Sequence, residues 1–308
     1  MKKIVSRLFL MLVFTGMLAT GLYFFGASTY PEPQSPEKRL HSSPPIPDSL
    51  AFAGEPVPLE YFDVRESLDR ELLVNSYFHS QTLRYLKLVP RYFEVIEPIL
   101  ARDSIPADFK YLALAESGFN HRVVSPSGAV GIWQFMEGTA KDYGLEISKE
   151  VDERYNLELA THAVCRYLKD SFKKYGSWTL TAASYNSGRR FVDRMMTIQR
   201  KQTYYDLLLG EETERYLFRI LALKLIMENP RDYGFKVDEK EKYPLLKTSA
   251  VRVNTAIPDL ALFAFEHGTN YKLLKMLNPW LRENYLTNVA GKSYTIILPD
   301  KDFRKVEN

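Results

Sequence analysis

The stretch from Tyr111 to Met136, YLALAESGFNHRVVSPSGAVGIWQFM, joins a short apolar helix to a loop that contains two glycines. In a helix that begins near position 106, four side chains share one face: Phe109, Leu112, Ala113 and Glu116. A carboxyl group on an apolar face loses hydration, which raises its pKa and keeps it protonated closer to neutral pH. Glu116 is therefore either a buried acid satisfied by an arginine or by backbone amides, or a proton donor in a cleft.

The loop after this helix has the features of a binding wall. Gly128 and Gly131 stand where the backbone must turn tightly or approach a ligand closely. Gln134 offers both a donor and an acceptor, and its neighbours are apolar: Trp133, Phe135 and Met136. Polar amides beside aromatic walls suit sugars, because sugar rings have apolar faces and hydroxyl edges. We expect the three apolar side chains to line the cleft and to exclude water from it.

A second cluster, AASYNSG, places Tyr185 and Asn186 at a helix end that Gly188 closes. Taken alone, this pattern is usually only a helix terminus followed by a turn. Whether Tyr185 and Asn186 belong to a functional site depends on where this cluster lies in the chain relative to the Glu116 stretch.

Helical periodicity surrounds both clusters and predicts an all-α domain over 59–240. The core motifs, on which the family resemblance given below rests, lie within 83–227. Pro90 and Pro98 are expected to interrupt the helical segment in which they occur. Cys165 is the chain's one cysteine, so it cannot form an internal disulfide. Because apolar residues share its helix face, we expect a buried structural thiol.

The C-terminal part differs in kind from the helical domain. AVRVN has the alternation of a strand, and SYTIILP has the composition of another. Two short helices fit between them: Pro258–Glu266 and Tyr271–Leu277. The prediction for 248–300 is a compact β-α-α-β module.

The N-terminal part is predicted to lie outside the folded domains. Residues 1–29 hold three cations followed by an apolar stretch over 8–27, which is typical of an export signal or of an uncleaved membrane anchor. In either case the basic end stays inside and the rest of the chain is exported. Residues 30–58 contain eight of the 17 prolines, which predicts an extended or disordered linker.

Charge and motif content exclude several classes of protein. Three of the 41 basic residues precede position 30, where there is no acid, so the rest of the chain balances 38 basic against 38 acidic residues. That balance argues against a nucleic-acid partner, which would require a basic surface. The histidines lack metal-binding spacing, and AGKSY lacks the first glycine of a phosphate loop. No metal and no cofactor are predicted.

Four pieces occur in a fixed order: ESGFN, SPSGAVGIWQFM, AASYNSG and ETERYLFRI. Together they resemble family 1 lytic transglycosylases, whose soluble-lytic-transglycosylase (SLT) domain has a goose-lysozyme-like fold. The two ends of the chain are similar to the membrane-bound lytic transglycosylase D subgroup. The tail resembles a divergent lysin-motif (LysM) module, a class that binds N-acetylglucosamine-containing glycans. It has NTAIPDL in place of the usual Gly-Asp-Thr, and the alternative is a domain that only packs against the helical one.

The resemblance implies a role for each motif residue. Glu116 corresponds to the single catalytic acid and base. The implied substrate-binding residues are Ser125, Gln134, Met136, Tyr185, Asn186 and Tyr216, the last reaching towards the acid. Trp133 stands where many relatives have methionine, and Ser184 is an extra residue in the A-A-Y-N-x-G pattern. Both differences can alter the shape of the sugar subsites.

The resemblance also implies an activity and a location. Family members cleave the β-1,4 bond between N-acetylmuramic acid and N-acetylglucosamine in peptidoglycan, leaving 1,6-anhydro ends, in the bacterial periplasm or cell envelope. Two alternatives stay open: a hydrolytic lysozyme-type muramidase of the same fold, and a catalytically idle peptidoglycan-binding or scaffold protein. A two-carboxylate glycosidase needs a second acid, for which Asp142 and Asp152 remain candidates.

Overall fold

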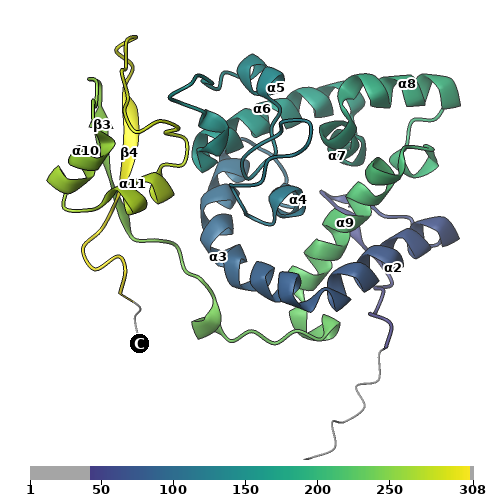
Figure 1. The fold of residues 1–308 in the computed structure, drawn as a ribbon. Coiled ribbons are helices and arrows are strands. Elements are labelled where there is room, and N and C mark those ends of the chain that lie inside the picture. Colours follow the sequence, from purple (N-terminus) through teal and green to yellow (C-terminus); the bar gives the residue numbers. More distant parts are fainter. Residues whose placement is uncertain (1–41, 306–308) are drawn as a thin grey trace, which may run out of the picture. The chain divides into compact units, whose positions relative to one another are not determined.

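The structure is a computed structural model that describes residues 42–305, a helical domain followed by a small module (Figure 1). The predicted export signal or anchor lies outside these residues. Within 42–305, no helix is both long and apolar enough to cross a membrane. The helices of the domain are α2 (Phe62–Tyr77), α3 (His79–Arg102), α4 (Phe109–Ser117), α5 (Glu137–Asp142), α6 (Leu157–Tyr175), α7 (Trp178–Ser187), α8 (Arg189–Gln199) and α9 (Glu211–Glu228). Short 3₁₀ turns lie at Glu153–Tyr155, Tyr204–Asp206, Pro230–Tyr233 and Glu239–Glu241.

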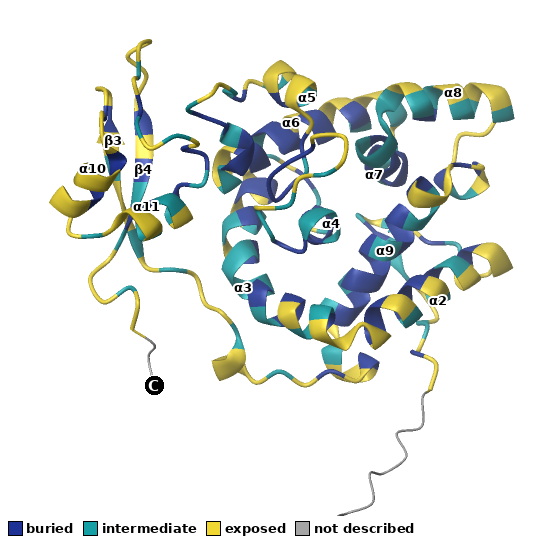
Figure 2. Cartoon of the chain, viewed as in Figure 1, coloured by how far each residue is buried: buried dark blue, intermediate teal, exposed yellow. Residues whose placement is uncertain are grey.

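Helix α9 lies at the centre of the domain because it is apolar on almost every side. It packs against α2, α4 and α7, and Figure 2 colours much of it as buried. Its buried apolar side chains are Tyr216, Leu217, Phe218, Ile220, Leu221, Ala222, Leu223, Leu225 and Ile226. The packing of α9 on α4 fixes Tyr216 relative to Glu116. On α6, Cys165 is buried, as predicted.

Helix α3 continues through Pro90 and Pro98, so the expectation that these prolines interrupt it is wrong. Each proline removes a backbone hydrogen bond and bends the helix, and Figure 1 shows α3 curved along its length. The helix persists because it packs against α4 and α6 and buries an apolar face there. The buried side chains on this face include Leu86, Phe93, Ile96, Ile99 and Leu100.

For residues 44–58 the linker prediction is wrong, because this segment folds onto the helical domain. Strand β1 (Ala51–Phe52) pairs antiparallel with β2 (Glu55–Pro56). Two apolar side chains of this segment, Phe52 and Val57, enter the domain's core, and Leu59 directly after it does the same. The carboxylate of Glu55 accepts a hydrogen bond from the backbone N–H of Thr179 at 3.0 Å, in the first turn of α7. The proline content alone predicts a linker. The segment is nevertheless ordered, because the apolar residues between the prolines bury enough surface to hold it on the domain.

The C-terminal module has the predicted β-α-α-β order. Strand β3 (Thr248–Val253) pairs antiparallel with β4 (Tyr294–Pro299), and α10 (Leu260–Glu266) and α11 (Tyr271–Leu277) lie between them in the chain. Alternate residues of β4 are buried, as expected for a sheet covered on one face: Tyr294, Ile296 and Leu298. The predicted fold class, mainly α with a small β-α-α-β module, is confirmed.

The module packs against the helical domain through a shared apolar cluster. Its members from both parts include Val130, Val151, Tyr155, Leu281 and Tyr294. Backbone hydrogen bonds join the two parts: Asp152 N–H donates to the Trp280 carbonyl at 2.9 Å, and Arg282 N–H donates to the Glu150 carbonyl at 2.7 Å. The module therefore packs against the helical domain. This packing does not exclude that the module also binds glycan.

Candidate active site

Glu116 lies in the last turn of α4, immediately before the residues that end this helix. Gly118 ends α4 with a φ of +55°, a left-handed conformation that glycine adopts without strain. A Cβ at Gly118 would lie 2.5 Å from Cε1 of Tyr85, so the glycine also permits close packing against α3. Glu116 is half-buried and lies on the apolar side of the helix, as the sequence predicts.

Tyr216 and Tyr185 reach the site from two other helices. The hydroxyl of Tyr216, which is 2% exposed on α9, donates a hydrogen bond to Oε1 of Glu116. Tyr185, on α7, donates from its hydroxyl to the carbonyl of Trp133 at 2.6 Å. Burial, and then the nearby charge of Glu116, raise the pKa values of both phenols. Both hydroxyls therefore stay protonated and act as hydrogen-bond donors.

The pKa of Glu116 is raised to about 7. Loss of hydration is the largest cause, whereas the hydrogen bond from Tyr216 and the charge of Arg219 lower the pKa. The negative charge of Glu212 adds a smaller increase. Near neutral pH the carboxyl group is thus present in both protonation states, so it can donate a proton in one step and accept one in the next.

The loop over 123–136 holds itself together with the polar groups that the sequence assigned to substrate. Gln134 has a φ of +48°, and its Nε2 donates to the carbonyls of Val123 at 3.1 Å and Gly131 at 2.9 Å. Ser125 Oγ accepts from the backbone N–H of Ala129 at 2.9 Å. Gln134 therefore keeps its Oε1 for a ligand, and Ser125 keeps its hydroxyl proton.

The expected apolar wall is mostly absent, because two of its three side chains point into the core. Trp133 is 0% exposed, and its Nε1 donates to Oγ1 of Thr161 at 2.8 Å. Phe135 is also buried, whereas Met136 is 43% exposed. Burial alternates over 133–136, which places Trp133 and Phe135 inside and leaves Gln134 and Met136 more exposed. The prediction that all three residues line the cleft is wrong for Trp133 and Phe135.

Asn186 joins two helices of the site. Its Oδ1 accepts a hydrogen bond from Oγ1 of Thr213 at 2.8 Å, which links α7 to the start of α9. Asn186 is half-buried, so its amide NH₂ is the part left to donate to a ligand.

Ser117 also helps to hold the site together, although the sequence did not single it out. Its Oγ donates to the carbonyl of Ile132 at 2.8 Å and so ties the end of α4 to the loop. This contact holds the residue beside Glu116 against the segment that carries Gln134. Its position inside the ESGFN motif was a signal that could have found it.

Arg219 was also missed, although it lies one turn beyond Tyr216 on α9. Its Nη1 is 2.9 Å from Oε1 of Glu212, and its Nε is 3.7 Å from Oε2 of the buried Glu71. The charge of Arg219 opposes the rise in the pKa of Glu116. The helical spacing of three residues from Tyr216 could have placed it on the same face.

Asp142 and Asp152 were the two candidates for a second acid. Neither is among the groups whose charge shifts the pKa of Glu116. Asp152 is 7% exposed and forms two hydrogen bonds to the Arg154 side chain, at 3.0 and 2.8 Å. Asp142 lies at the end of α5 and lines a separate surface pocket with Tyr143. The acid whose charge reaches Glu116 is Glu212.

Replacing Tyr216 with phenylalanine should move the alkaline limb of the activity profile to higher pH. The hydrogen bond from Tyr216 favours the carboxylate of Glu116 and so lowers its pKa. Without it the pKa rises, and the protonated acid persists to higher pH. The measurement is kcat/KM against pH for both proteins. An unchanged or lowered limb would show that Tyr216 does not control the ionisation of Glu116.

The chain matches two family models, in agreement with the four sequence motifs and with the helical fold. Residues 95–208 match the model of the transglycosylase SLT domain, and residues 249–302 match that of the soluble lytic transglycosylase C-terminal LysM-like domain. The resemblance predicted from the four motifs is confirmed, because the models of the SLT domain and of the LysM-like domain match the chain in that order. Tyr216 lies outside the first matched range, and it is the packing of α9 that brings its hydroxyl to Glu116.

A curated relative, the membrane-bound lytic murein transglycosylase D of Escherichia coli K12, is 28% identical over 262 residues, 82% of this chain and 56% of the relative. The chain thus spans about half the length of the curated relatives it matches. Two solved structures are also similar in part. An inactive mutant of lytic transglycosylase Slt from Pseudomonas aeruginosa has 20% identity and a TM-score of 0.39, covering 49% of this chain and 26% of that one. The 70 kDa soluble lytic transglycosylase of Escherichia coli has 21% identity and a TM-score of 0.40, covering 50% and 27%.

Proposed function

We propose that this protein is a peptidoglycan lytic transglycosylase that cleaves the β-1,4 bond between N-acetylmuramic acid and N-acetylglucosamine. The observation that carries the proposal is Glu116, a half-buried acid with a pKa of about 7 inside the matched SLT domain. Tyr216 orients its carboxyl group through the hydrogen bond to Oε1. A binding protein has no need of a titrating acid held in this way.

The proposed reaction uses Glu116 twice. The protonated acid gives its proton to the glycosidic oxygen as the bond from that oxygen to the anomeric carbon of the muramic residue breaks. The resulting carboxylate then removes the proton from the muramic 6-hydroxyl, whose oxygen bonds to the anomeric carbon and closes the 1,6-anhydro ring. Glu116 ends protonated, and no water is consumed. The hydrogen bond from Tyr216 stabilises the carboxylate between the two steps.

The lytic outcome rests on proximity and on the SLT match. Trp133 and Phe135 lie in the core, so they form no apolar wall that would exclude water from the cleft. The lytic outcome is therefore not argued from exclusion of water. The 6-hydroxyl belongs to the same sugar as the anomeric carbon, and intramolecular attack can have an effective concentration of up to about 10⁵–10⁸ M. Gln134, Asn186 and the exposed Met136 are the proposed contacts to the sugars, together with Ser125 and Tyr185.

The products of digestion test the proposal. We expect mass spectrometry of digested sacculi to show mainly 1,6-anhydromuramyl ends, because the 6-hydroxyl outcompetes water. A hydrolysed end is heavier by one water, about 18 Da. A digest dominated by the heavier ends would establish the lysozyme-type muramidase instead. No new ends of either kind, from a folded protein that binds sacculi, would establish the idle binding protein.

We further propose that the enzyme acts in the cell envelope, with 44–240 as the catalytic domain, because residues 44–58 pack on it, and 248–300 as the module. The apolar stretch over 8–27 would direct export and, if retained, anchor the chain in a membrane. Its partners would then be peptidoglycan glycan strands and, through the N-terminus, the membrane. The name of the matched relative, a membrane-bound murein transglycosylase, supports this placement.

A further inference from the structure

A buried acid lies on α2, the helix that packs along α9 (Figure 1). This residue, Glu71, is 1% exposed. Neither the sequence motifs nor the proposed reaction uses it, and α2 lies outside the residues that match the SLT model. Burying a carboxylate is costly unless cations and hydrogen bonds compensate its charge. The contacts of Glu71 therefore indicate what this charge does in the molecule.

The partners of Glu71 are two arginines of α9. Nε of Arg215 donates a hydrogen bond to Oε1 of Glu71 at 2.6 Å, and Nε of Arg219 lies 3.7 Å from Oε2. Within residues 42–305, Oε2 has no hydrogen-bond donor, so Arg219 meets it through charge alone. The two arginines are four positions apart and share a face of the helix. Tyr216 lies between them in the chain, so Glu71 holds α9 on both sides of the residue that bonds to Glu116.

Arg219 lies between two acids. Its Nη1 and Nη2 donate to the carboxylate of Glu212 at 2.9 and 3.4 Å, on the exposed side, while Glu71 faces it from the buried side. The charge of Arg219 reaches Glu116 and lowers its pKa. A charge buried as Glu71 is buried is only weakly screened by salt. Glu71 therefore offsets part of the positive charge that Arg219 presents to Glu116.

The other groups around Glu116 come from helices different from α2. On α9 these are Tyr216 and Glu212, besides Arg219, and from α7 the phenol of Tyr185 also meets the charge of Glu116. The phenol of Tyr85, on α3, meets the charge of Arg219 as well. Arg219 is thus the group through which an acid on α2 can influence Glu116.

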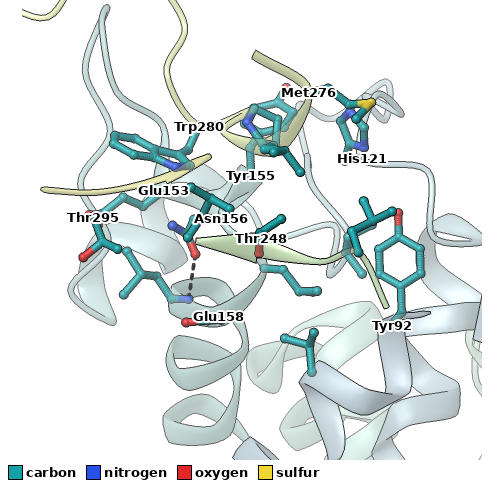
Figure 3. Close-up of a pocket in the computed structure, with 18 of the residues that line it drawn as sticks. Tyr92, His121, Glu153, Tyr155, Asn156, Glu158, Thr248, Met276, Trp280 and Thr295 are labelled. Atoms are coloured by element: carbon teal, nitrogen blue, oxygen red, sulfur yellow. Dashed lines mark hydrogen bonds between the residues drawn. The ribbon is translucent and has the colours of Figure 1, made fainter. Parts of the chain in front are cut away.

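The network belongs to the helical domain alone. A cavity of about 500 Å³ lies where the module meets that domain (Figure 3). Arg91, Ile132 and Trp280 are among the residues that line it, whereas Glu71 and Arg219 are not. A change at Glu71 should therefore leave the junction with the module intact.

We propose that Glu71 is a positioning residue of the active site, which holds Arg219 and sets how much of its positive charge Glu116 meets. The inference rests on the proposed function, because that function makes Glu116 the catalytic acid. Glu71 acts through Arg219 and takes no part in the chemistry. Its negative charge keeps Glu116 protonated to a higher pH than Arg219 would otherwise allow.

The test is a titration of Glu116 itself, by NMR of the full chain in detergent with carbon-13 in the glutamate carboxyl groups. The signal that is missing from Glu116→Gln identifies the residue. Glu71→Gln keeps an oxygen that accepts from Arg215 but loses the charge that offsets Arg219. Arg219 stays bonded to Glu212, so the pKa of Glu116 should fall and the alkaline limb of kcat/KM should move to lower pH. We expect a fall of up to about one pH unit, since a charge in direct contact shifts a pKa by about 1–3 units and Glu71 acts at one remove.

Three further variants separate charge from packing. Glu71→Asp keeps the charge, so the pKa of Glu116 should stay near that of the parent even where the shorter side chain lowers stability. Glu211→Gln is the matched control, because it removes an exposed acid that lies 3.7 Å from the same Arg215, and it should leave the pKa unchanged. Arg219→Gln should raise the pKa, and Glu71→Gln added to it should cause little further change.

A pKa of Glu116 that is unchanged or raised in Glu71→Gln would overturn the proposal. So would an equal fall with and without Arg219, or equal shifts in Glu71→Gln and Glu71→Asp, because direct action or packing would then explain the effect. If Glu71→Gln does not fold, Arg219→Gln decides in its place, and a pKa that fails to rise there overturns the proposal. The NMR titration requires no turnover. A chain that titrates as expected but releases no glycan ends would therefore contradict the proposed function alone.

Discussion

Replacing Glu116 with glutamine is expected to reduce peptidoglycan turnover by at least the roughly 10²–10⁴-fold typical of a general acid–base group. The amide is isosteric with the acid, but it can neither donate the first proton nor accept the second. Tyr216 can still donate its hydrogen bond to the amide oxygen, so the fold and the affinity for glycan should persist. The measurement is the rate of release of anhydro-ended fragments, alongside sacculus binding. A folded variant that keeps substantial activity would remove Glu116 from the mechanism.

Glu212→Gln is the matched control for this experiment. Glu212 is exposed on α9, and it influences Glu116 through charge without touching the carboxyl group. Because its negative charge raises the pKa of Glu116, neutralising it should lower that pKa and move the alkaline limb of activity to lower pH. Most of the maximal rate should remain. Equal losses in the two variants would mean that the net charge of α9 matters, and not the proton on Glu116.

The same Glu116→Gln protein should also show a pH-dependent difference in stability. The folded pKa of Glu116, about 7, lies above its ordinary value of 4.5. Its protonated form therefore contributes stability that is fully present below the unfolded pKa and is lost as pH rises through the folded pKa. The glutamine variant does not ionise, so its stability relative to the parent should increase over that window. Urea unfolding at several pH values measures the difference.

Replacing Gly131 with alanine is expected to destabilise the protein by roughly 3 kcal/mol or more. Gly131 has a φ of +79°, which alanine adopts only with strain, and a Cβ there would overlap the carbonyl oxygen of Arg154. That oxygen belongs to backbone, so it cannot move aside as a flexible side chain would. Gly131 also accepts a hydrogen bond from Gln134, so the loop beside Glu116 should lose its order together with activity.

Gly128→Ala separates the clash from the backbone strain. Gly128 lies in the same loop with a φ of +84°, but a Cβ there would meet nothing within 4 Å. The Gly128→Ala variant should be destabilised only by the cost of placing alanine in the left-handed conformation, about 1–2 kcal/mol. Unfolding by urea, with the same denaturant slope for each protein, gives both values. Similar losses for the two variants would show that the contact with Arg154 is relieved by movement of the loop.

Part of the site could be predicted from neighbouring residues alone. Glu116 shares a helix face with Phe109, Leu112 and Ala113, and this spacing indicated its partly buried position without any knowledge of the fold. The order of the four motifs then supplied Tyr185, Asn186 and Tyr216 as companions. The contact between Tyr216 and Glu116 joins residues 100 positions apart, and the sequence gives no distance between helices. Only the packing of α9 on α4 decides it.

Other parts of the structure depended on which surfaces meet in three dimensions. The sequence by itself determined the fold class and the β-α-α-β tail, because helical and strand periodicities repeat over a few residues. Tertiary structure decided that Trp133 points into the core, that α3 continues through Pro90 and Pro98, and that residues 44–58 pack on the domain. It also formed the cavity at the module junction. The physical reason is that burial against distant residues can outweigh local propensity, and local sequence does not record which distant surface is available.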